Sequence, residues 1–143
     1  MAESILLHKL RARSDLAHVF VESAGTGGWH AGDLPDRRTR AVLEANGITA
    51  WSRARQVRAD DFARMTYVVA MDEDNEKDLL ALPAAARGGA REKVSLASEW
   101  VGGRREIVPD PYYGDVDGFH GIFKQLDGIT DAMIATLAKR HAQ

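Results

Sequence analysis

One short segment of the chain holds a carboxyl group that could transfer a proton, with two aromatic side chains next to it. Asp110 lies between two prolines and is followed by Tyr112 and Tyr113. Each proline fixes its own φ and restricts the residue before it, so we expect an irregular, stiff loop. A carboxyl group held in such a loop can act as a general acid or base with little entropy lost. An Asp-Pro pair is more commonly only a turn, and the segment alone does not decide between the two readings.

The residue types that the chain lacks narrow this chemistry. Its 143 residues include no cysteine, which excludes a thiol nucleophile, a thiolate metal site and a disulfide within this sequence. The five histidines show no pair at metal-ligand spacing within an acidic cluster. We therefore expect no metal and no other cofactor.

The composition predicts one ordinary globular domain over residues 1–143. The chain is 28% charged and 45% hydrophobic, which suits a single core. A net charge of -2 without a long basic block argues against nucleic acid as a partner. No apolar run approaches the roughly 20 residues that span a bilayer, and the first residues do not resemble a signal peptide. We expect a cytoplasmic protein that does not bind a membrane.

The first third of the sequence predicts helix, strand, loop and helix in turn. An amphipathic helix is predicted from Ala2 to about Leu16, although it has no capping residue before it. A β-branched and aromatic run, His18–Ser23, predicts a strand, and the small residues 24–28 predict a flexible loop. The next helix is expected to begin at Asp36 and to stop at Asn46-Gly47.

The remaining elements alternate between helix and strand. The predicted order is a short helix opened by Asp60-Asp61-Phe62, an apolar strand Tyr67–Met71, a helix capped at Asp72 and running to about Leu82, a loop from Pro83 to Arg91, a strand Glu92–Ala97, and a final helix from about Phe119 to Lys139. A continuous apolar strand between helices is typical of a parallel sheet covered on both faces. The fold class expected from this alternation is α/β.

Four stretches, in this order and at this spacing, resemble the low-molecular-weight protein tyrosine phosphatases over nearly the whole chain. They are Ser23-Ala24-Gly25-Thr26 followed by Gly28-Trp29-His30-Ala31-Gly32; Ala54-Arg55-Gln56-Val57; Met71-Asp72-Glu73-Asp74-Asn75; and Asp110-Pro111-Tyr112-Tyr113-Gly114. The resemblance implies a three-layer sandwich in which helices flank a small parallel sheet. It also implies that a phosphotyrosine protein or another aryl phosphate is the substrate.

In this family, as the resemblance implies, a cysteine thiolate attacks phosphorus while loop N–H groups and an arginine hold the phosphate oxygens. Asp110 matches the acid that protonates the leaving phenolate. Trp29, Tyr112 and Tyr113 match aromatic side chains at the rim of the substrate cleft, although single aromatic residues more often pack in a core. Ser23 matches a serine that supports the phosphate loop, and would otherwise be an ordinary serine at a strand end.

Two further matching positions, Arg55 and Asp72, are expected to be structural, as a loop anchor and a helix cap. The sequence also departs from the family. Many members have a histidine shortly before the Ala-Arg-Gln stretch, where this chain reads Trp51-Ser52-Arg53, and Glu99-Trp100-Val101-Gly102 lacks an expected Tyr-Asp. Both departures weaken the expected support for a phosphate loop.

The resemblance begins just past the family's first strand and its loop of Cys, five residues and Arg, because Met1-Ala2-Glu3 matches the start of the helix after that loop. We expect the missing strand to be central in the sheet, so its loss would leave two strand edges unpaired. The favoured explanation is a start assigned too late in a genuine phosphatase, which would be a monomer. Without that loop the chain should be inactive.

A real deletion is the alternative explanation for the missing loop. It would leave a non-catalytic module for binding or interaction, which could dimerise through its open strand edges. An arsenate reductase on the same fold fits poorly, because its redox relay needs further cysteines.

Overall fold

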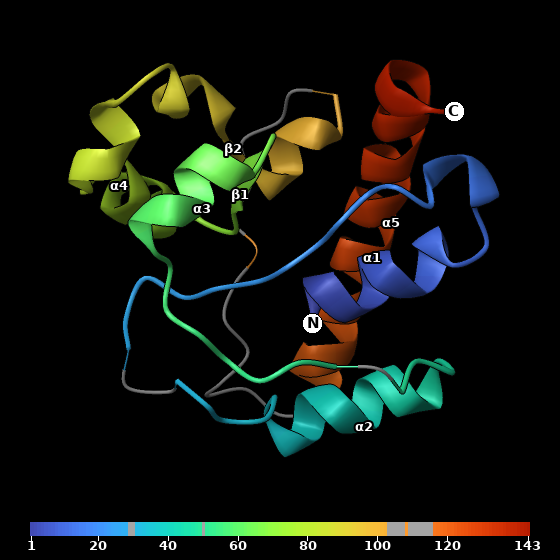
Figure 1. Ribbon diagram of the computed structural model, residues 1–143. Coiled ribbons are helices and arrows are strands. Elements are labelled where there is room, and N and C mark those ends of the chain that lie inside the picture. The colour runs from blue at the N-terminus through green and yellow to red at the C-terminus, as the bar shows by residue number, and fades with distance from the viewer. Residues whose placement is uncertain (29–30, 50, 103–107, 109–115) are drawn as a thin grey trace.

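The computed structural model describes residues 1–28, 31–49, 51–102, 108 and 116–143, in which a two-stranded parallel sheet has helices on both sides (Figure 1). The helices are α1 (Ala2–Leu10), α2 (Arg37–Ala45), α3 (Ala59–Arg64), α4 (Glu73–Ala81) and α5 (Val116–His141). The strands are β1 (Val68–Ala70) and β2 (Val94–Leu96). Short 3-10 helices complete the set: η1 (Ser14–Leu16), η2 (Pro83–Ala86), η3 (Ala90–Lys93) and η4 (Ala97–Trp100).

The two faces of the sheet are covered by different helices. β1 and β2 run parallel, with Val68 opposite Val94 and Ala70 opposite Leu96. These four side chains share one face and pack with apolar residues of α3 and α4, because side chains alternate along a strand. Val69 faces the other side and packs against the cluster that includes α5. The α/β prediction of a small parallel sheet flanked by helices is therefore confirmed.

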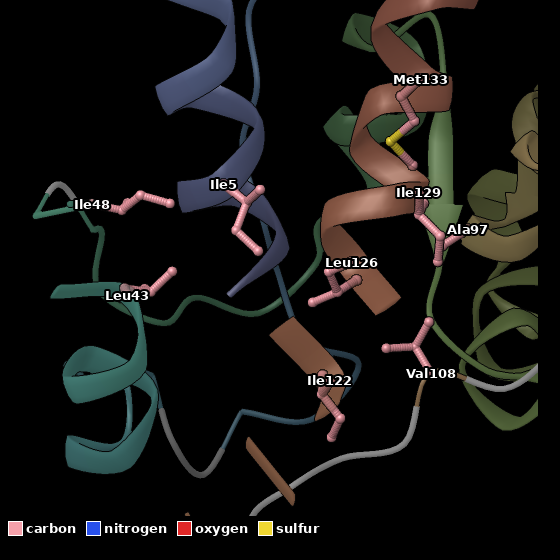
Figure 2. Packing of buried hydrophobic residues seen from close by; sticks show 9 residues of the cluster. All are labelled: Ile5, Leu43, Ile48, Ala97, Val108, Ile122, Leu126, Ile129 and Met133. Atoms are coloured by element: carbon pink, nitrogen blue, oxygen red, sulfur yellow. The ribbon is translucent and has the colours of Figure 1, made fainter. Parts of the chain in front are cut away.

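The core on the α5 side joins the first helix to the last (Figure 2). Ile5 of α1 and Leu43 of α2 have no exposed surface, and Leu126 and Ile129 of α5 are nearly as deeply buried. Each such side chain stabilises the fold by roughly 1.5–3 kcal/mol. At the edge of this core, the Lys9 ammonium lies 2.8 Å from a carboxylate oxygen of Asp127 and 2.8 Å from one of Asp131.

The predicted cap at Asp72 is confirmed, and Asp36, at the predicted helix start, is also a cap. Asp36 accepts a hydrogen bond from the Arg38 N–H at 2.8 Å, and Asp72 accepts one from the Asn75 N–H at 2.7 Å. Each carboxylate satisfies a backbone donor that has no partner in the first helical turn. Gly47 has a φ of +76°, which suits the glycine predicted to stop α2.

The first predicted helix is shorter than expected. α1 ends at Leu10, and Arg13 adopts an extended conformation with φ -120° and ψ 91°. Its guanidinium binds Asp15 through two hydrogen bonds of 3.0 and 2.8 Å. The following 3-10 turn places Leu16 in the core at 1% exposure. The helical spacing of Leu16 therefore reflected burial and not a continuous helix.

The predicted strand His18–Ser23 is wrong. Residues 18–24 have no regular secondary structure, and an isolated parallel bridge between Gly25 and Gln56 is the nearest strand-like pairing. Val19 and Val21 still pack beside Leu10 and Leu16. Strand formation needs a hydrogen-bonded neighbour, and no strand within the described residues pairs with this segment. The local sequence favoured an extended chain, but pairing decides whether it becomes a strand.

The later elements match their predictions with shifted ends. β1 lies within the predicted run Tyr67–Met71, and β2 lies within Glu92–Ala97. The predicted loop from Pro83 to Arg91 contains η2 and the start of η3. α5 begins before Phe119 and ends beyond Lys139, and apolar residues along its length, such as Phe119, Leu126 and Leu137, are buried in the core.

Candidate functional site

The structure describes one of the five predicted site residues. Ser23 lies at the end of the extended segment that follows η1, and it is exposed. Asp110, Trp29, Tyr112 and Tyr113 lie outside the described residues. The described part of the site consists of the elements that lead into those segments.

The segment that leads to Asp110 begins beside the carboxyl end of β1. The Val108 N–H donates to the carbonyl oxygen of Met71 at 3.0 Å, and Met71 directly follows the strand. Val108 is itself buried at 4% exposure, so this point is fixed to the core. Sites in α/β folds lie outside the carboxyl ends of the strands. Val108, two residues before the predicted acid in the sequence, thus lies at the edge of the sheet where such sites are found.

A carboxylate at the start of α1 gathers two loops. Glu3 Oε1 accepts hydrogen bonds from the Ser23 N–H at 2.6 Å and from the Ser23 hydroxyl at 2.8 Å. The other oxygen, Oε2, accepts one from the Ser52 hydroxyl at 2.7 Å. These three residues are called the Glu3 cluster below. A negative group in the first turn is also stabilised by the positive end of the helix dipole.

The loop that carries residue 29 is fixed at its base to the stretch before α3. The Gly25 N–H donates to the Arg55 carbonyl, and the Val57 N–H donates to the Gly25 carbonyl, both at 2.8 Å. Gly28 lies so close to Gln56 that a Cβ there would be 2.8 Å from Gln56 Oε1. A larger residue at this position would require the Gln56 side chain to move.

A second carboxylate, that of Asp61 in α3, binds residues of the stretch that precedes this helix. Asp61 accepts hydrogen bonds of 2.8 and 3.0 Å from Arg55 and of 2.8 Å from Arg64. It also accepts one of 2.8 Å from the Arg58 N–H. Glu22 pairs with Arg55 at 2.7 Å. Asp61, Arg55, Arg64 and Glu22 form the Asp61 cluster, in which Arg55 is a loop anchor as predicted.

The environment of Asp61 favours its ionised form. Burial raises the pKa of this carboxyl, but hydrogen bonds from Arg55, Arg58 and Arg64 outweigh that effect and hold the pKa at about 2. Its side chain is 6% exposed, so the charge is held inside the protein by its partners. A carboxylate locked in this way serves structure and is unsuited to proton transfer near neutral pH.

A hollow of about 320 Å³ lies at the other end of the strands. Its lining includes Tyr67, Trp100, Thr136 and Arg140. The Tyr67 ring meets the Trp100 ring edge to face, with centroids 5.1 Å apart, and its hydroxyl lies 2.7 Å from Nε2 of His141. Tyr67 precedes β1, so this hollow is at the amino end of the sheet. It is separate from the edge where Val108 meets Met71.

Within the described residues, no group of His, Asp or Glu side chains could hold a metal ion, and no helix is long and apolar enough to cross a membrane. No sequence pattern predicted Glu3 as a bonded carboxylate, Ser52 as its partner, or Asp61 as the centre of a cluster. Helical periodicity reports burial, whereas these contacts join segments 6 to 49 residues apart. The departure at Trp51-Ser52-Arg53 was the one signal for Ser52.

Solved structures with this architecture are tyrosine phosphatases and related enzymes. The protein tyrosine phosphatase of Entamoeba histolytica has a TM-score of 0.85 and is 29% identical, with 96% of this chain and 87% of that chain covered. A structure described as a Drosophila arginine phosphatase has a TM-score of 0.84 and is 29% identical, with 94% of this chain and 87% of that chain covered. The fold is thus that of the small phosphatases.

The sequence comparisons agree with the fold. A fission yeast low molecular weight phosphotyrosine protein phosphatase is 36% identical over 144 residues, which cover 96% of this chain and 88% of that protein. The profile of the family described as "Low molecular weight phosphotyrosine protein phosphatase" matches residues 1–143. The chain belongs to this family.

Proposed function

We propose that this sequence is the larger part of a protein tyrosine phosphatase whose nucleophilic loop precedes Met1. The observation that carries the proposal is the family match over residues 1–143 in a chain that has no cysteine. The relatives support it, because the chain covers 88% of the fission yeast protein and 87% of the Entamoeba structure. Each of these relatives therefore has residues without a counterpart here.

The open part of the sheet supports an additional strand. β1 pairs with β2 on one side only, and residues 18–24 run extended without strand partners in the described chain. Phe20 is 62% exposed in this segment. A strand between β1 and residues 18–24 would have a neighbour to pair with on each side and would lead directly into α1. A loop at the end of that strand would then meet the positive N-terminus of α1, which suits a phosphate group.

The proposed reaction has two steps. The upstream thiolate attacks the phosphorus of phosphotyrosine, a P–S bond forms, and the P–O bond to the phenol breaks while the Asp110 carboxyl donates its proton to the leaving oxygen. Water then attacks phosphorus, its proton passes to the Asp110 carboxylate, and the thiolate and inorganic phosphate are released. Trp29, Tyr112 and Tyr113 would flank the aryl ring. Ser23 would support the phosphate loop indirectly, since its hydroxyl is bonded to Glu3.

The chain of 143 residues is expected to be inactive, because it contains no thiol. Two proteins test this: the chain itself, and a longer chain that begins at the first upstream start codon in the same reading frame. The longer chain should hydrolyse p-nitrophenyl phosphate and phosphotyrosine peptides, and the shorter chain should not. Turnover by the purified shorter chain would contradict the mechanism, as would an upstream sequence without Cys, five residues and Arg.

The substrate assay should include phosphoarginine. One structural neighbour is described as an arginine phosphatase, and its identity to this chain equals that of the Entamoeba tyrosine phosphatase. We propose the aryl ester as substrate, because Trp29, Tyr112 and Tyr113 match positions that flank a ring. Faster hydrolysis of a phosphoarginine peptide than of a phosphotyrosine peptide would overturn this assignment.

The second candidate is a non-catalytic interaction module, which the unpaired segment with its exposed Phe20 favours. This candidate predicts that no upstream loop is encoded and that the short chain self-associates through its strand edges. Sedimentation of the short and long chains separates the two cases. A monomeric, active long chain supports the phosphatase, and a stop codon upstream together with a stable short-chain dimer supports the module. A cytoplasmic location stays a prediction of the sequence.

A further inference from the structure

The Glu3 cluster joins three segments that are far apart in the sequence. Glu3 belongs to the first turn of α1, Ser23 ends the extended segment, and Ser52 lies in the connection between α2 and α3. The bonds span 20 and 49 residues. Because one carboxylate oxygen receives both Ser23 donors and the other receives the Ser52 hydroxyl, a single side chain fixes both loops to the helix.

The three hydrogen bonds that Glu3 accepts come from neutral donors, and its carboxylate also interacts electrostatically with the terminal ammonium of Met1. Among the residues that the structure describes, no Lys, Arg or His side chain is ion-paired with Glu3. Hydrogen bonds to an ionised acceptor are stronger than those between neutral groups, so three of them can hold the loops without a basic side chain. A basic partner at this place would compete for a phosphate group at the start of α1, whereas serine hydroxyls would not.

Ser23 connects Glu3 to the base of the loop that carries Trp29. Two residues beyond Ser23, Gly25 makes two backbone hydrogen bonds of 2.8 Å with Arg55 and Val57. The base of the loop is thus tied to α1 through Glu3 and to the stretch before α3 through Gly25. If the first tie is lost, the loop stays attached to that stretch but is no longer fixed relative to the helix.

We infer that Glu3 is a positioning residue of the phosphatase site, an inference that rests on the proposed function. It holds Ser23, at the base of the loop that carries Trp29, against the first turn of α1, where the phosphate loop would join. Glu3 acts through Ser23 and Ser52 and does not touch the substrate. A phosphoryl group and an aryl ring must be held together for an in-line attack, so loosening this tie should reduce catalysis of aryl esters most.

The tie itself is tested in the 143-residue chain by amide hydrogen exchange. In Glu3→Ala the Ser23 amide should exchange about tenfold faster, because its acceptor is gone. The amides of Gly25 and Val57 should keep their rates, because their carbonyl acceptors remain. Glu44→Gln on the exposed side of α2 is the matched control and should change none of them. An unchanged Ser23 rate in Glu3→Ala would overturn the inference.

The catalytic consequence is tested in the longer chain. The ratio of kcat/KM for p-nitrophenyl phosphate to that for β-glycerophosphate should fall about tenfold in Glu3→Ala, because the ring is less well placed than the phosphate. Ser52→Ala removes one of the three bonds and should lower the ratio about threefold. Glu3→Gln keeps one oxygen acceptor and should lie between native protein and Glu3→Ala, which covers the case in which Glu3→Ala does not fold.

Each result has one meaning. A purely structural role would lower both rates together and leave the ratio unchanged, which would overturn the positioning role. A native longer chain without activity toward either ester would refute the proposed function, while the Ser23 exchange experiment would still decide whether the tie exists. A lowered ratio with a normal rate for β-glycerophosphate is the expected outcome.

Discussion

Two carboxylates each join separate segments of this protein, but their partners differ. Asp61 is 5% exposed and is surrounded by two arginines and a backbone N–H, whereas Glu3 is only partly buried and is bonded to two serines. Removing a buried charge from an arginine cluster leaves uncompensated charges behind, which is costly. Removing Glu3 leaves neutral hydroxyls that water can satisfy. The Asp61 cluster therefore maintains the fold, and the Glu3 cluster can adjust a site.

The largest expected change in stability follows from replacing Asp61. Asp61→Ala should lower the free energy of unfolding by about 3 kcal/mol, because Arg55 and Arg64 lose their shared acceptor. Urea denaturation of the 143-residue chain measures the change. The control is Asp60→Ala next to it, whose 69% exposed side chain also pairs with Arg64 and should cost under about 1 kcal/mol. Equal effects of the two variants would contradict the distinction.

The pH dependence of stability should separate the clusters further. The pKa of Asp61 is about 2 when folded and 3.8 in its ordinary state. The lowered pKa contributes stability that is present above pH 3.8 and is lost as the pH falls through 2, a difference of roughly 2 kcal/mol. Asp61→Asn should lack this part of the acid dependence when urea midpoints are compared from pH 5 to pH 2. A native acid profile in Asp61→Asn would show that other groups cause it.

A smaller loss of stability is expected when the guanidinium of Arg55 is replaced by another positively charged group. Arg55→Lys should cost roughly 1–2 kcal/mol of unfolding free energy, because an ammonium cannot bind both oxygens of Asp61 and also reach Glu22. Thermal unfolding at fixed pH measures it. Arg53→Lys is the control, since Arg53 is exposed and its guanidinium donates to the Gly32 carbonyl. If the Arg55→Lys protein is as stable as the native chain, a positive charge at this position is enough to stabilise the Asp61 cluster.

The smallest expected effects belong to the Glu3 cluster. Glu3→Ala should cost about 1 kcal/mol of unfolding free energy, and Ser52→Ala less than that. In a double-mutant cycle the two changes should show a coupling of roughly 0.5–1 kcal/mol, because they remove the same hydrogen bond. Chemical denaturation of the four proteins gives this coupling. If the two free-energy changes are strictly additive, the Ser52 hydroxyl does not bind Glu3 in solution and is hydrogen-bonded to another group.

Local sequence rules predicted the ends of helices better than the pairing of strands. Asp36 and Asp72 cap their helices through contacts two and three residues away, so their role was visible in the sequence. The run at Val19 and Val21 looked like a strand, but a strand also needs a neighbour, which local sequence does not report. The apolar run Tyr67–Met71 between helices predicted the parallel sheet and the α/β class, and the resemblance to the family added the three-layer arrangement.

The candidate site was predicted as residue types and not as a network. Ser23 and Arg55 were identified from the resemblance, and the structural role of Arg55 is confirmed by its bonds to Asp61. Glu3 was read only as the start of a helix, because its partners lie 20 and 49 residues away. Contacts between residues so far apart in the sequence form only in the folded chain, and they produce no periodic pattern in the sequence.

The salt bridges and hydrogen bonds of Lys9 have a consequence for how the chain folds. They tie α1 to α5 across 118 to 122 residues, and α5 also packs on α2 and covers one face of the sheet. Contacts of such long range form late, because most of the chain must be closed into a loop first. During synthesis α1 leaves the ribosome long before its partner does. The nascent chain therefore exposes Ile5 and Leu43 until the last helix emerges, and in that interval a chaperone would bind it best.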